Sequence, residues 1–85
     1  MPAIAEFQGI SLFVYYPPRE HPPPHFHAIY ADQDASFDIR TLAMTAGNLR
    51  PAQRKIVTEW ASGRQAGLMD CWNRAMAGQQ PGRIG

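Results

Sequence analysis

Several features that would point directly to a function class are scarce in this chain. One cysteine among 85 residues leaves no internal disulfide and is typical of a reducing compartment. Eight basic residues against seven acidic ones give a formal net charge of +1, so the broad positive field that attracts nucleic acid or anionic lipid is missing. No apolar run is long enough to span a bilayer, and the first residues form no basic leader. We therefore expect a cytoplasmic protein without a signal peptide and without a membrane partner.

Size and composition indicate one small folded unit. Hydrophobic residues make up 45% of the sequence, which favours a packed core over disorder. We expect a single α+β domain over residues 1–77 and a flexible C-terminal tail over residues 78–85, where glycine, glutamine and proline dominate. Cys71 stands next to Trp72 in a helical pattern, and we interpret it as a buried structural thiol rather than a nucleophile.

The first half of the chain has the pattern of short strands. Side chains of different character alternate over residues 10–16, 25–30 and 35–40, and each run predicts one strand. Residues 31–34 form a turn, and residues 42–48 indicate a short extra strand or an extended edge. The predicted fold class is therefore α+β, with a small antiparallel sheet of three or four strands.

The second half has a helical pattern from Pro51 to about Met76. Proline suits the first position of a helix, and Gly63 indicates a break between two helices. Apolar side chains repeat at helical spacing on both sides of this break. We expect two C-terminal helices packed on one face of the sheet, with Trp60 and Trp72 in the core between the layers.

All three histidines fall within seven residues, in the run His21-Pro22-Pro23-Pro24-His25-Phe26-His27. Successive side chains of a strand point to opposite faces, so His25 and His27 share the face away from the core. Asp38 should lie across from one of them on that face. A two-residue loop at Ala31-Asp32 pairs it with His25, and a loop one residue later pairs it with His27.

Two kinds of chemistry fit these residues, beside the alternative of an exposed cluster without a function. As a metal site, His25, His27, His21 and Asp38 would bind a divalent ion such as zinc or nickel. His21 is the least secure ligand, because an extended proline run would place it roughly 12 Å from His25 unless the run bends or holds a cis bond. As an acid–base site, His25 and His27 would transfer protons, Asp38 would orient one of them and Arg40 would stabilise phosphate charge.

A further set of short motifs runs through most of the chain, from about Met1 to Met76. They are Met1-Pro2-x-Ile4, Phe7-x-Gly9-Ile10, Tyr15-Tyr16, Pro23-Pro24-His25-Phe26-His27, Asp38-Ile39, Gly47-x-Leu49, Glu59-Trp60-Ala61 and Trp72. With these motifs the chain resembles a family of small bacterial proteins known as domain of unknown function 4160. Two positions depart from the family pattern: Arg64 stands where a helical histidine is frequent, and Ala31-Asp32 stands where a Gly-Gly turn is common.

The resemblance implies a small α+β domain that is often encoded beside another short protein. It therefore implies a regulatory, toxin–antitoxin-like pairing, and our first hypothesis is a partner-binding module with exposed Phe13 and Tyr15 forming an interface patch. The alternatives are a small hydrolase acting on RNA and a metal-binding domain. The histidine face is also a candidate interface of a homodimer.

Overall fold

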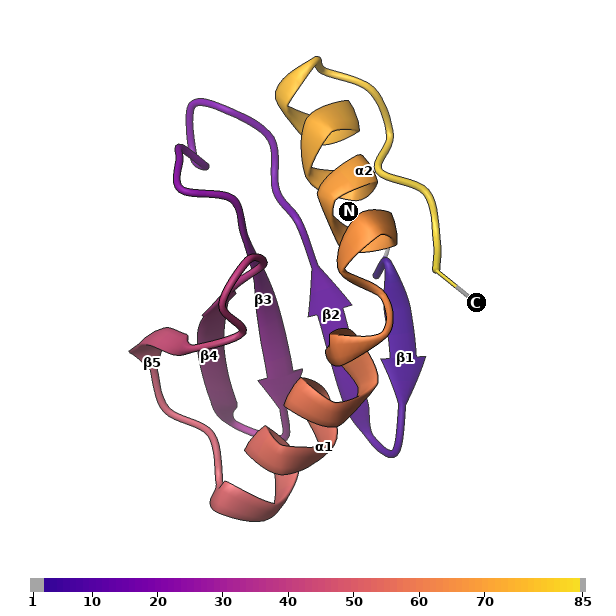
Figure 1. The fold of residues 1–85 in the computed structure, drawn as a ribbon. Helices are drawn as coiled ribbons and strands as arrows, with labels where there is room; N and C mark the ends of the chain where they lie inside the picture. The colour runs from indigo at the N-terminus through magenta and orange to yellow at the C-terminus, as the bar shows by residue number, and fades with distance from the viewer. Residues whose placement is uncertain (1–2, 85) are drawn as a thin grey trace.

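Strands occupy the first half of the chain and helices the second (Figure 1). The structure, a computed structural model, describes residues 3–84; Met1, Pro2 and Gly85, parts of the expected domain and tail, lie outside the described residues. The elements are β1 (Ala5–Phe7), β2 (Ile10–Phe13), β3 (His25–Tyr30), β4 (Gln33–Asp38), β5 (Met44–Gly47), α1 (Pro51–Ser62) and α2 (Gln65–Met76). The α+β fold with two C-terminal helices is confirmed.

The sheet is an antiparallel meander in which each strand pairs with the next along the chain, in the order β1-β2-β3-β4-β5. It has five strands rather than the three or four expected, and the additional strand is β1. Three residues are too few to show an alternating pattern. Gln8 and Gly9, with φ of 48° and 78°, join β1 to β2 through the two-residue turn that needs positive φ at both central positions.

The register between β3 and β4 is one of the two that the sequence allowed. Tyr30 pairs with Gln33 across the two-residue loop at Ala31 and Asp32, and His25 therefore pairs with Asp38. The apolar side chains of both strands consequently share one face, since Phe26 lies opposite Phe37 and the two rings stack with centroids 5.5 Å apart.

The helices cover that apolar face and close the core. α1 begins at Pro51 and ends at Ser62 before Gly63, as the sequence predicted. Trp72 is 4% exposed, and the partly buried Trp60 stacks on Phe7 of β1 with centroids 4.7 Å apart. The largest fully buried side chains of the core are Phe26, Phe37, Ile4, Ile10, Leu12, Ile39, Leu68, Val14 and Val57. Within the part of the chain that the structure describes, no helix covers the opposite face of the sheet (Figure 1).

The segment after α2 returns along that helix to the start of the chain (Figure 1). The Ile84 N–H donates to Ile4 O at 2.7 Å, and the Arg83 guanidinium donates to Ala3 O at 3.1 Å. The proposed boundary at residue 77 and the flexibility of the tail remain predictions. Within residues 3–84, neither helix has the length and apolar character needed to cross a membrane.

Candidate metal centre

A proline-rich connection brings a carboxylate to the histidines. Residues 14–24, called here the proline loop, join β2 to β3 and contain five prolines, with cis peptide bonds at Pro17-Pro18 and Pro22-Pro23. Within this loop the Glu20 N–H donates to Tyr16 O at 3.3 Å. The Glu20 side chain is 4% exposed, which is unusual for an acidic residue. A buried carboxylate requires partners that offset its loss of hydration.

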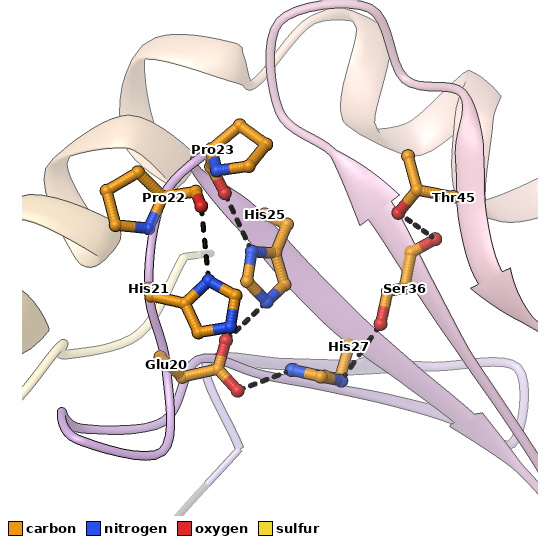
Figure 2. A network of polar contacts seen from close by, with 8 residues as sticks. All are labelled: Glu20, His21, Pro22, Pro23, His25, His27, Ser36 and Thr45. Carbon is orange, nitrogen blue, oxygen red and sulfur yellow. Dashed lines mark hydrogen bonds and ion pairs between the residues drawn. The ribbon is translucent and has the colours of Figure 1, made fainter.

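The partners of Glu20 are the two histidines of β3 (Figure 2). Its Oε1 lies 2.8 Å from His27 Nε2, and its Oε2 contacts His25 Nε2. Both rings are on the face of the sheet away from the helices, as predicted from the alternation of β3. One nitrogen from each ring and one carboxylate oxygen lie within 4.8 Å of one another, which makes a three-ligand set for a metal ion.

The hydrogen bonds of the rings determine which nitrogens carry protons. His25 Nδ1 lies 2.8 Å from Pro23 O, and a carbonyl oxygen can only accept, so Nδ1–H donates to it. In the neutral ring, Nε2 then presents a lone pair toward Glu20. His27 Nδ1 lies 3.3 Å from the Ser36 hydroxyl, which can either donate or accept. The Glu20 carboxylate can only accept, so His27 Nε2–H donates to its Oε1 at 2.8 Å. His27 offers Nε2 as a ligand when its hydrogen moves to Nδ1, where the Ser36 hydroxyl can accept it.

Glu20 Oε2 is left without a hydrogen bond, although it is buried and beside an imidazole. Its contact with His25 Nε2 lacks the geometry of a donated hydrogen, and the neutral tautomer provides no hydrogen there. A buried carboxylate oxygen without a donor costs free energy unless a cation or a proton lies between it and the nitrogen. This orphaned oxygen distinguishes the cluster from an ordinary surface ion pair.

Aromatic rings surround the cluster. The His25 ring lies 5.1 Å from both the His27 ring and the Trp72 ring, measured between centroids. Tyr15 packs 4.9 Å from His27, and the Arg19 guanidinium lies 4.1 Å from the Tyr15 centroid. Burial raises the pKa of Tyr15, and the Arg19 charge opposes that rise. The Trp72 and Tyr15 rings thus pack against the two imidazoles of the ligand set.

A cavity of about 240 Å³ opens beside the cluster. Its walls are His21, Pro23, His25, Ser36, Asp38, Thr45 and Ala46. His21, which an extended proline run would have separated from His25, thus lines the same cavity. It is not part of the three-ligand set, because its ring nitrogens are not within 4.8 Å of all the ligand atoms of Glu20, His25 and His27.

The structure places the other two predicted site residues differently. Asp38 pairs with His25 in the register, but its Oδ1 accepts hydrogen bonds from the backbone N–H groups of Arg40 at 2.7 Å and Thr41 at 2.9 Å. The Thr41 N–H is the main cause of a lowered pKa for Asp38, and the Arg40 N–H adds to it. The Asp38 carboxylate therefore caps the turn after β4.

Arg40 is exposed and belongs to that turn, because β4 ends at Asp38. It is thus not on the strand face where the alternation predicted it, and it is not among the residues that line the cavity. His25 and Asp38 line the cavity, whereas His27 faces Glu20. Hydrolysis of RNA by these four residues remains a prediction.

Glu20 is the site residue that reasoning from the sequence missed. It precedes His21 directly, so a carboxylate beside the histidine run was the available signal. Strand and helix periodicity says nothing about where a loop residue lies relative to β3. Glu20 is buried because the proline loop folds back onto the sheet.

Comparison with known proteins places the chain in a family. The model of one family, described as Domain of unknown function (DUF4160), matches residues 9–73 of the 85. The matched region contains the proline loop, β3 and β4, and so every residue of the three-ligand set. Searches of curated proteins and of solved structures found no match. The chain belongs to the DUF4160 family, as its sequence motifs indicated.

Proposed function

We propose that this protein binds a divalent transition metal, zinc or nickel, through Glu20, His25 and His27. The observation that carries the proposal is the buried Glu20 Oε2, which has no hydrogen-bond donor among the described residues and contacts His25 Nε2, a lone pair when the neutral ring carries its hydrogen on Nδ1. Two electron-rich atoms in contact repel each other. A cation between them converts this repulsion into two coordinate bonds.

The dimensions and the chemistry of the cluster suit such an ion. A zinc ion bonded at about 2.0–2.2 Å keeps tetrahedral ligand atoms roughly 3.3 Å apart. The ligand atoms lie within 4.8 Å of one another, so small side-chain rotations bring them to that spacing. Imidazole nitrogen suits zinc and nickel, and a single carboxylate oxygen completes sets of this kind.

The surroundings of the ligands also support metal binding. His25 donates its second ring N–H to a backbone carbonyl, which fixes its tautomer and orientation as is usual for histidine ligands. The Ser36 hydroxyl can accept a hydrogen bond from Nδ1–H of His27 in the same way. One carboxylate with two neutral imidazoles carries a charge of −1, and a divalent cation replaces this buried negative charge with a shared positive one.

The variant Glu20→Gln distinguishes a metal site from an ion pair between a protonated histidine and the Glu20 carboxylate. If His25 Nε2 is a lone pair, a glutamine amide can donate to it, so Glu20→Gln should unfold in urea with a free energy within about 0.5 kcal/mol of the parent. The same variant should lose zinc binding in calorimetry. If the cluster is instead an imidazolium–carboxylate pair, Glu20→Gln should cost about 1.5–3 kcal/mol, and the parent should bind no zinc.

Metal removal provides the corresponding test on the unaltered protein. Zinc at 100 times its dissociation constant should stabilise the fold by about 2.7 kcal/mol, and EDTA should reverse this. For a domain of this size the melting temperature should rise by more than about 10 °C. Glu59→Gln removes one exposed carboxylate on α1 and serves as the charge-matched control, with an unchanged response. An equal response in Glu20→Gln would contradict the proposal.

A second candidate function is the partner-binding, regulatory role that the family resemblance implies. It is favoured by the helix-free face of the sheet, where Phe13 and Tyr15 stack in parallel with centroids 5.9 Å apart. Both rings are partly exposed, and such a patch suits a protein interface.

The partner for this test is a short protein encoded beside the gene, where the family resemblance implies one. Co-expression and size-exclusion chromatography should yield a complex that Phe13→Ser weakens and that Glu59→Gln on the helix side leaves intact. A self-associated chain without the second protein would instead indicate a homodimer, and a monomer under both conditions would contradict this candidate.

A further inference from the structure

We infer that His21 is a fourth ligand, which turns in from the proline loop when the metal binds. The inference rests on the proposed metal site and specifies it: the complete set is Glu20 with His21, His25 and His27, all four supplied by this chain. Figure 2 shows the His21 ring on the side of the loop that faces His25 and the Glu20 carboxylate.

The hydrogen bonding of His21 repeats that of His25. His21 Nδ1 lies 3.2 Å from Pro22 O, just as His25 Nδ1 lies 2.8 Å from Pro23 O. Each carbonyl can only accept, so each Nδ1 carries a hydrogen and, in the neutral ring, each Nε2 presents a lone pair. Consecutive prolines thus hold two rings in the tautomer that coordinates metal through Nε2, the arrangement by which proteins orient histidine ligands.

The position of His21 allows the ring to reach the ion. It follows Glu20 directly in the chain, and it lines the same cavity as His25. Its side chain is exposed, and turning the ring inward breaks one exposed hydrogen bond, from Nδ1–H to the Pro22 carbonyl. His21 therefore lies in the wall of the cavity that opens beside the three-ligand set.

A four-ligand set determines what kind of metal site this is. Three protein ligands leave a position for water or substrate, as in catalytic zinc sites, whereas four protein ligands close the coordination sphere. With His21 bound, the metal would link the tip of the proline loop to β3 at two adjacent residues. Metal binding would then fix the conformation of the loop, which is a structural or regulatory role rather than a hydrolytic one.

Cobalt(II) is a suitable probe, because four-coordinate Co²⁺ absorbs visible light far more strongly than six-coordinate Co²⁺. The parent protein should bind Co²⁺ with the intense spectrum of a tetrahedral site. His21→Gln should keep the fold by circular dichroism, lose most of that intensity and bind Co²⁺ at least about tenfold more weakly. Thr45→Ala alters the same cavity without removing a ligand and should match the parent in both respects.

The outcomes distinguish the two proposals. If the parent binds Co²⁺ and His21→Gln gives the same spectrum and affinity, the fourth-ligand inference is wrong while the three-ligand site stands. If the parent binds no Co²⁺, the metal site itself is wrong, and the role of His21 with it. A spectrum that changes as strongly in Thr45→Ala as in His21→Gln would assign the effect to the cavity and overturn the inference.

Discussion

The two faces of the sheet have different roles, although the same strands form both. On the face that the helices cover, Phe26 and Ala28 of β3 are fully buried. On the open face, His25 and His27 of the same strand are 18% and 17% exposed and hold a buried carboxylate. Because strand side chains alternate, one six-residue segment supplies both the core and the candidate site. Chemistry on one face can therefore change without repacking the other.

The separation of the two faces is incomplete at one point. Trp72 of α2 is buried with the core, yet its ring lies 5.1 Å from His25. It reaches the start of β3, where the proline loop joins the sheet. The site is thus in contact with the core through one aromatic side chain, and a change at the metal ligands should be detectable there.

The largest expected effect tests whether the two faces differ in stability. Phe26→Ala removes a fully buried ring that stacks on Phe37, and it should lower the free energy of unfolding by about 3–5 kcal/mol. Ile29→Ala on the open face of the same strand should cost about 1 kcal/mol, because that side chain is only partly buried. Urea denaturation measures both. Equal losses would mean that something covers the open face in solution.

A smaller effect should appear at the contact between the faces. The chain has two tryptophans, so fluorescence can be assigned by substitution. Nickel should quench the emission of Trp72 beside His25, and Trp60→Phe should leave this quenching intact. Trp72→Phe should cost about 1 kcal/mol and abolish the response, since Trp60 packs on Phe7 of the edge strand. Quenching that persists in Trp72→Phe would place the metal elsewhere.

The smallest effect concerns the turn after β4 and depends on pH. Hydrogen bonds from the backbone N–H groups of Thr41 and Arg40 lower the pKa of Asp38 in the folded protein. Its contribution is therefore fully present above the unfolded value of about 3.9 and is lost as the pH falls through the lower folded value. Asp38→Asn should cost at most about 0.5 kcal/mol at neutral pH, given solvent screening.

Urea denaturation over a range of pH measures this contribution. The difference between the parent and Asp38→Asn should shrink as the pH drops below about 4. A constant difference would show that the capping geometry, rather than the charge, accounts for the cost. The zinc response should be unchanged in this variant, because the Asp38 carboxylate is occupied by the turn.

The sequence predicted the parts of the molecule that local pattern controls. Alternation identified β3 and its inward Phe26, and the short turn at Ala31 and Asp32 allowed the observed register with β4. Pro51 and Gly63 marked the limits of α1. β1 was missed because three residues carry no period, although Gly9 readily adopts the positive φ that a two-residue hairpin turn needs.

The site was predicted only in part, because its ligands come from elements of different kinds. His25 and His27 follow from the strand alone. Glu20 reaches them through a loop whose path no periodicity specifies, and the same path brings His21 to the cavity. Arg40 was misplaced because the alternation was extended past Asp38, where the side chain of Asp38 itself turns the backbone.

The C-terminal segment and β5 make the two borders of the sheet unequal. Residues beside β1 are tied to the segment after α2 through Ile84 and Arg83, whereas β5 pairs only with β4 among the described strands. An unpaired border is a template for another chain, and a border already occupied is not. Strand addition by another chain is therefore expected at β5 rather than beside the start of β1, where the C-terminal segment already bonds to Ala3 and Ile4.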